Sequence, residues 1–160
     1  MLANKLAKAL VGEGAIVYLT REGDYDLASS TINRKRNDLY NRVLLINNSN
    51  SDIYISIHLN SSTSSKWNGI QVFYSNILER NKKLADSITD ILKSNMKNIR
   101  DVKKDNSYYM YSKIKVPGVL IEAGFISNPN DNYKIRQDDY QDVLINNIVL
   151  GIENYFKYNT

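Results

Sequence analysis

The 160-residue chain contains no cysteine, which excludes disulfide bonds, thiolate metal ligands and cysteine nucleophiles. It also lacks any run of about eighteen apolar residues, so the sequence predicts no membrane span. The opening stretch MLANKLAKALVGEGA is too polar for the core of a signal peptide, and we expect any export signal to lie outside this sequence. The lack of cysteine leaves the cellular compartment open.

Histidine is nearly absent as well, because His58 is the only one in the chain. One histidine cannot form a zinc site or a Ser-His-Asp triad by itself. The formal net charge is +4, which suits either a soluble surface or an anionic polymer as partner. The lysines are scattered, and the twelve tyrosines form no recognisable stacking motif, so the sequence predicts no nucleic-acid partner.

The apolar residues follow helical and strand periodicities in alternation. Short apolar strands that do not alternate with polar residues are typical of a mostly parallel sheet with helices on both faces. We therefore expect an α/β fold and one domain over residues 1–160. The predicted helices cover 2–10, about 32–46, 77–96 and 137–156, and the predicted strands cover 15–20, 53–60, 69–75 and 116–125.

Two of these strands end on a reactive side chain. IYISI is followed by His58, and VPGVLI is followed by Glu122. In open α/β sheets the ligands bind beyond the carboxyl ends of the strands, so parallel strands would bring imidazole and carboxylate to one edge. Histidine is a common zinc ligand, and a carboxylate beside a metal can act as a general base. A hydrogen-bonded cap for His58 and a structural ion pair for Glu122 are the competing interpretations.

Four motifs occur in order along the chain: TREGD at 20–24, SIHLN at 56–60, GIQVFY at 69–74 and PGVLIEAGFISNPND at 117–131. Together they resemble the zinc-dependent N-acetylmuramoyl-L-alanine amidases of the type-3 family. The resemblance implies hydrolysis of the amide between N-acetylmuramic acid and the L-alanine of the peptidoglycan stem peptide. It also implies that His58 is a zinc ligand and that Glu122 is the catalytic carboxylate.

The sequence departs from the family pattern at its beginning. The family's first zinc-binding histidine, in a GHGG-like loop after a first strand, and its glutamate ligand have no counterpart here. We expect that strand and both ligands to lie upstream of Met1, so residues 1–160 alone should show little or no hydrolysis. A missing strand would also expose a sheet edge, which suggests an edge-mediated homodimer or an activator protein as partner.

Other functions are compatible with the same residues. The chain could be a non-catalytic amidase-like module that binds cell-wall glycopeptide or a protein. The resemblance implies a bacterial protein of the cell envelope or the extracellular space, possibly associated with spores. Members of the family act in cell separation, lysis, and sporulation or germination, and the sequence does not choose between these roles.

Overall fold

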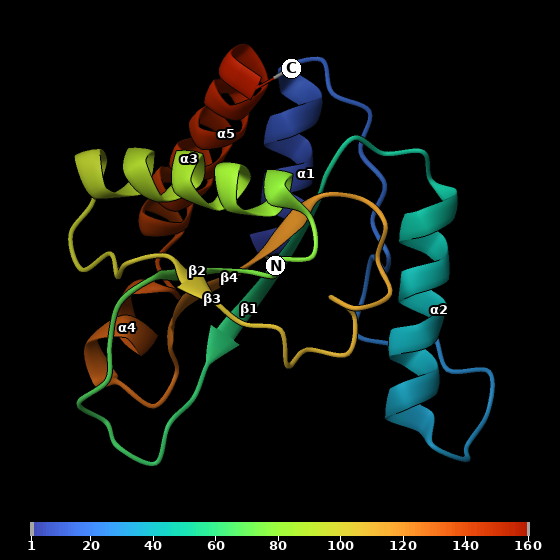
Figure 1. The fold of residues 1–160 in the computed structure, drawn as a ribbon. Coiled ribbons are helices and arrows are strands. Elements are labelled where there is room, and N and C mark those ends of the chain that lie inside the picture. Colours follow the sequence, from blue (N-terminus) through green and yellow to red (C-terminus); the bar gives the residue numbers. More distant parts are fainter. Residues whose placement is uncertain (1, 160) are drawn as a thin grey trace.

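A central sheet with helices on both sides forms the body of the molecule in the computed structural model, which describes residues 2–159 (Figure 1). The α/β class predicted from the sequence is thereby confirmed. None of the described helices is long and apolar enough to cross a membrane. The helices are α1 (Leu2–Gly12), α2 (Arg34–Asn48), α3 (Glu79–Asn95), α4 (Pro129–Lys134) and α5 (Asp138–Asn159), and the strands are β1 (Tyr54–Asn60), β2 (Gln71–Tyr74), β3 (Lys103–Lys104) and β4 (Gly118–Phe125).

The sheet is mixed and has the strand order β1-β4-β2-β3. Strand β1 is parallel to β4, and β2 is parallel to β3, as the sequence predicted for most of the sheet. The pairing between β4 and β2 is antiparallel. Strand β4 is buried along its whole length, while β1 is only partly buried. The most enclosed strand of the sheet therefore carries Glu122.

One face of the sheet makes the main core. Alternate residues of β4 point to it because side chains of a strand alternate between faces: Val119, Ile121 and Ala123 belong to one apolar cluster with residues of α3 and α5. Leu120 points the other way and packs with Phe73 and Tyr111 in a second, smaller cluster. The face that carries Leu120 also carries Glu122, so the polar site lies opposite the main core.

The contact between α3 and α5 depends on Gly151. A Cβ atom at this position would lie 2.6 Å from the Cα of Ile88, which is closer than packed atoms come. We expect Gly151→Ala to lower the free energy of unfolding by about 1–2 kcal/mol, because overpacking outweighs the gain in helix propensity. Gly12→Ala is the matched control, since its Cβ would meet nothing within 4 Å. Urea unfolding of both variants checks this, and equal stabilities would contradict it.

The strand predicted at 15–20 is wrong. This segment forms no ladder among the described residues, and Ile16 and Tyr18 are 83% and 65% exposed. Apolar and β-branched residues form a strand only where a neighbouring strand can take their backbone hydrogen bonds. Within the described chain β1 pairs with β4 only, so no such neighbour is at hand. Two elements were not predicted, the two-residue β3 and the short helix α4.

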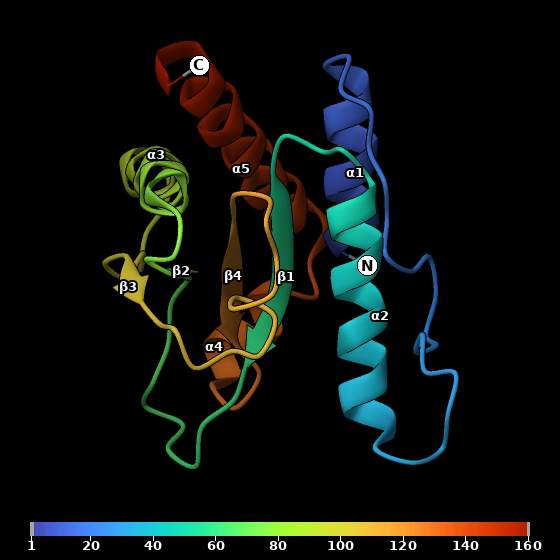
Figure 2. The ribbon, with the colours of Figure 1, turned by 45° about the vertical axis from the view of Figure 1, so that its right-hand side comes forward.

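Helix α2 stands apart from the helices of the main core. Both views show it on the other side of β1 from α3 and α5 (Figures 1 and 2). Asn47 of α2 donates to the carbonyl of Lys113 at 3.0 Å and accepts from the backbone N–H of Lys115 at 2.8 Å. These two hydrogen bonds attach α2 to the loop that leads into β4. Val43 is the one buried residue of the helix.

Candidate active site

His58 and Glu122 lie side by side in the carboxyl-terminal halves of two parallel strands. His58 of β1 is the register partner of Glu122 of β4. Paired residues point to the same side of a sheet, so both side chains point away from the face that carries Ile121. On the other side of β4, Gln71 is the partner of Glu122. One row of imidazole, carboxylate and carboxamide groups therefore crosses three strands.

The Glu122 carboxyl group is buried without a full set of partners. The residue is 6% exposed, and its Oε2 has no hydrogen-bond partner among the described residues. Burial disfavours the charged form of a carboxyl group, and it raises the pKa of Glu122 from 4.5 to about 6. A carboxylate with a pKa near neutrality can take a proton from water and release it again, as a general base must.

The His58 imidazole lies at the outer end of this row. Its Nε2 is 3.0 Å from the Oγ of Ser56, two residues earlier on the same face. The side chain is exposed, yet partial loss of water lowers the pKa of His58, and the charges of Arg42 and Arg21 lower it further. The imidazole is therefore held in its neutral form at physiological pH, which is the form that binds metals or accepts protons.

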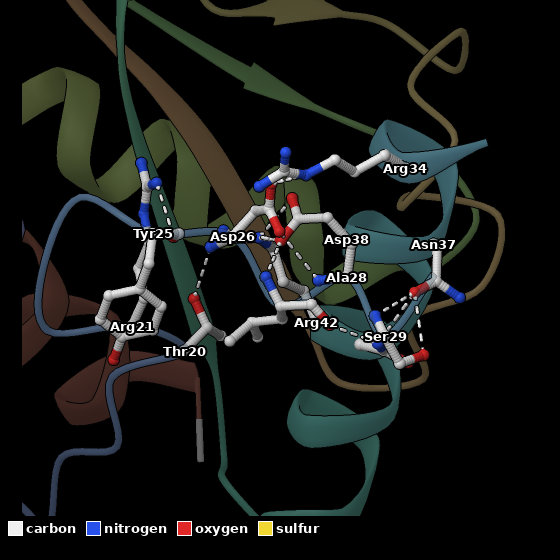
Figure 3. A network of polar contacts seen from close by, with 12 residues as sticks. Thr20, Arg21, Tyr25, Asp26, Ala28, Ser29, Arg34, Asn37, Asp38 and Arg42 are labelled. Atoms are coloured by element: carbon white, nitrogen blue, oxygen red, sulfur yellow. Dashed lines mark hydrogen bonds and ion pairs between the residues drawn. The ribbon is translucent and has the colours of Figure 1, made fainter. Parts of the chain in front are cut away.

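Both arginines belong to a polar network that joins the TREGD stretch to α2 (Figure 3). Arg42 forms an ion pair with Asp38 at 3.0 Å, four residues earlier on the helix, and donates from Nη1 to the Oγ1 of Thr20 at 3.0 Å. Arg21 donates to the carbonyl of Tyr25 at 3.1 Å. The network fixes two positive charges on the β1 side of the site.

Gln71 is a site residue that the sequence did not reveal. It is 7% exposed, and its Nε2 donates to the carbonyl of Asp101 at 3.0 Å. A polar residue between the apolar Ile70 and Val72 was the available signal, since alternation places it on the face away from the core. Its position beside Glu122 follows from an antiparallel pairing, which the sequence pattern did not predict.

Asp131 fixes the end of β4 against the start of β2. Its Oδ2 accepts from the backbone N–H of Gly69 at 2.8 Å and from that of Phe125 at 3.0 Å. Gly124, the residue before Phe125, has φ 144°, a conformation that favours glycine, and it lies beside an irregularity in the register of β1 and β4. One carboxylate thus holds two strand ends near Glu122.

The serine-rich loop after β1 is held by turn chemistry. Asn128 accepts with Oδ1 from two backbone N–H groups at the start of α4, and its Nδ2 donates to the carbonyl of Ser65 at 2.7 Å. The backbone N–H of Ser62 donates to the Oγ of Ser127 at 3.0 Å. These bonds tie loop 61–69 to the segment between β4 and α4.

A zinc ion would require more ligands than this row offers. Within residues 2–159 no group of three or more His, Asp or Glu side chains is placed to hold a metal ion. Catalytic zinc sites use three protein ligands and a water molecule. His58 and Glu122 have the right chemistry but do not make a complete set, so the described residues by themselves do not fit zinc.

Comparison with known proteins assigns the chain to a family of amidases. Residues 1–154 match the family described as N-acetylmuramoyl-L-alanine amidase, and the chain belongs to this family. The germination-specific N-acetylmuramoyl-L-alanine amidase of Bacillus subtilis (strain 168) is 41% identical over 160 residues, which cover 97% of this chain and 68% of that protein. The probable cell wall amidase LytH of Staphylococcus aureus is 32% identical, and the chain spans 47% of its length.

Solved structures agree with this assignment. The CwlD amidase from Clostridioides difficile, in complex with the GerS lipoprotein, has a TM-score of 0.92 and 33% identity, covering 99% of this chain and 84% of that one. The N-acetylmuramoyl-L-alanine amidase AmiC2 of Nostoc punctiforme has a TM-score of 0.83 at 24% identity, which supports the fold alone, and covers 98% of this chain and 81% of that one. The family resemblance seen in the sequence is confirmed.

Proposed function

We propose that the protein hydrolyses the amide between the lactyl group of N-acetylmuramic acid and the L-alanine of the stem peptide, within the cell envelope. The observation that carries this proposal is the register pairing of His58 with a buried Glu122 whose Oε2 has no partner. A structural ion pair for Glu122 is not supported, because no salt bridge to it is found among the described residues.

Glu122 acts on protons in this proposal. Its carboxylate takes a proton from the water that attacks the carbonyl carbon, and the C–N bond then breaks. The departing alanine amine needs a proton to leave, and the protonated Glu122 supplies it. The buried setting suits this exchange because it raises the pKa of Glu122 to about 6. A carboxyl group with a pKa near neutrality can both accept the proton of the water and donate it to the amine.

His58 is assigned the role of a zinc ligand, as the family resemblance implies. The other protein ligands are not among the residues that the structure describes. Residues 1–160 on their own should therefore bind zinc weakly, with less than the roughly 10 kcal/mol of a complete site, and should release little product. Clear hydrolysis by this polypeptide with zinc would contradict that expectation.

The test of the proposal is the product. The protein is expressed from its whole gene and incubated with purified peptidoglycan and zinc, and the released material is examined by mass spectrometry. We expect stem peptides with a free N-terminal alanine and glycan strands that carry a newly freed lactyl carboxylate. Cuts within the peptide or between sugars would overturn the assignment.

The second candidate is a non-catalytic amidase-like module that binds cell-wall glycopeptide or a protein. The incomplete metal set within residues 2–159 is the observation that favours it. In the same incubation such a module would sediment with peptidoglycan and release no peptide, so the product decides between the two functions.

A protein partner is part of the proposal. CwlD of Clostridioides difficile has been solved in complex with the GerS lipoprotein, and its likeness to this chain supports a partner of that kind. The germination-specific Bacillus subtilis relative supports a role with spores. A homodimer that pairs through the outer edge of β1 is the alternative, and light scattering at high concentration separates it from a monomer.

A further inference from the structure

Arg100 extends the row of site residues by one more strand position. Ile70 and Ile99 form a parallel bridge, and both belong with the main core. The next residue on each side, Gln71 and Arg100, therefore points to the opposite face, which is the face of Glu122. The backbone N–H of Arg100 donates to the carbonyl of Ile70 at 2.8 Å, which fixes its place.

Two aromatic rings hold the Arg100 guanidinium. Its Cζ lies 5.0 Å from the ring centroid of Trp67 and 5.7 Å from that of Phe125. A Cβ atom on Gly69 would meet the Cγ of Arg100 at 3.5 Å, so the side chain passes over a position without a side chain. Stacking on aromatic faces pre-orders a guanidinium and leaves its N–H donors free.

The side-chain N–H donors of Arg100 meet no acceptor in the part of the chain that the structure describes. No ion pair or side-chain hydrogen bond of Arg100 is found among residues 2–159, although the residue is half-buried. The nearby acids are engaged elsewhere: Asp101 pairs with Lys93 at 2.5 Å, and Asp131 accepts from two backbone N–H groups. A half-buried, pre-ordered guanidinium without a partner is a site for an anion that arrives with a ligand.

We propose that Arg100, braced by Trp67 and Phe125, binds a carboxylate of the stem peptide and so selects acidic peptides. This rests on the proposed amidase function. Neighbouring strands are about 4.8 Å apart, so two strand steps separate Glu122 from Arg100 by roughly 10 Å. An extended peptide rises about 3.3 Å per residue, which places the carboxylate on about the second or third residue from the scissile amide.

Trp67 allows the test without any measurement of activity, because it is the only tryptophan in the chain and is 53% exposed. Residues 1–160 are titrated with N-acetylmuramoyl-L-alanyl-D-glutamic acid, and with the same compound after both glutamyl carboxyl groups are converted to carboxamides. Trp67 fluorescence and calorimetry report binding. We expect the acid to bind about tenfold or more tightly than the amide, since the guanidinium pairs only with the acid.

Arg100→Gln should abolish this preference, and Arg100→Lys should retain part of it. Arg80→Gln removes the same charge from an exposed position on α3 and should change nothing. Equal affinity of the wild-type chain for acid and amide, or an undiminished preference in a folded Arg100→Gln chain, would overturn the proposal. Repeating the titrations with Glu122→Gln excludes any effect of hydrolysis.

Failure of this proposal and failure of the proposed function are distinguishable. If the whole-gene protein releases alanine-terminated peptides but Arg100→Gln keeps the acid preference, the carboxylate site is wrong and the amidase stands. If the chain prefers the acid through Arg100 but no amide is cleaved, the binding site stands and the enzymatic assignment is wrong.

Discussion

Glu122→Gln is expected to lower the rate of amide hydrolysis by the whole-gene protein by about 10²–10⁴-fold, the usual contribution of a positioned general base. Glutamine has nearly the same shape but cannot accept the proton of the attacking water. The measurement is the initial rate of release of alanine-terminated peptides from peptidoglycan. A variant that retains more than a tenth of the wild-type rate would remove Glu122 from the catalytic role.

The same substitution should stabilise the metal-free fold. The pKa of Glu122 is about 6 in the folded protein against an ordinary 4.5, so ionisation is penalised in the folded state only. The penalty is absent below pH 4.5, grows as the pH rises, and is complete above pH 6, where it amounts to about 2 kcal/mol. Glu122→Gln removes it, and the free energy of unfolding should therefore rise most above pH 6.

Urea unfolding with a chelator at pH 4 and pH 7.5 measures this difference. Glu153→Gln makes the same chemical change at an exposed position of α5 and is the control; we expect it to stay within about 0.5 kcal/mol of wild type at both values. If Glu122→Gln gave no larger gain at pH 7.5 than at pH 4, the carboxyl group would not be ionising against a burial penalty.

Asp131→Ala is expected to lower the free energy of unfolding by about 2–4 kcal/mol. The carboxylate accepts from the backbone N–H groups of Gly69 and Phe125, both buried residues, and alanine would leave both donors unsatisfied at a cost of about 1–3 kcal/mol each. Since these bonds hold the ends of β4 and β2, the site row should lose its register, and activity should fall with stability.

Asp131→Asn separates the loss of the two hydrogen bonds from the loss of the negative charge. Asparagine keeps an oxygen acceptor, so we expect a smaller loss than for alanine. Asp90→Ala removes an exposed acid from α3 and should leave stability nearly unchanged. Equal losses for the alanine and asparagine variants would mean that charge, and not the two hydrogen bonds, is what matters at Asp131.

The parts of the fold that follow from local pattern could be predicted. Strands β1 and β4 and helix α3 are marked by apolar runs or stripes. The first reactive side chain after each strand's apolar run is His58 in β1 and Glu122 in β4, although both strands continue beyond these residues. The segment 15–20 has an equally apolar pattern and is not a strand, because strand formation depends on a partner that local sequence does not specify. The two-residue β3 is too short to carry any periodicity.

The site was only partly predictable for the same reason. A reactive residue at a strand end is visible in one sequence, so two members of the row could be named. Gln71 and Arg100 join the row through the pairings of β2, one of which is antiparallel. These pairings are long-range. The partly buried carboxylate of Asp131 likewise bonds to backbone N–H groups, and no pattern of side chains in the sequence predicts such bonds.

The two sides of the site differ in how much apolar surface holds them to the rest of the protein. On the Gln71 side the floor rests on the main apolar cluster. On the His58 side lies helix α2, which has a single buried residue and is held by hydrogen bonds such as those of Asn47 and Arg42. Segments with little apolar burial open at lower free energy than the body of a protein. In the proposed amidase, we expect opening on the α2 side to make room for a glycan strand while Glu122 keeps its place in the buried strand β4.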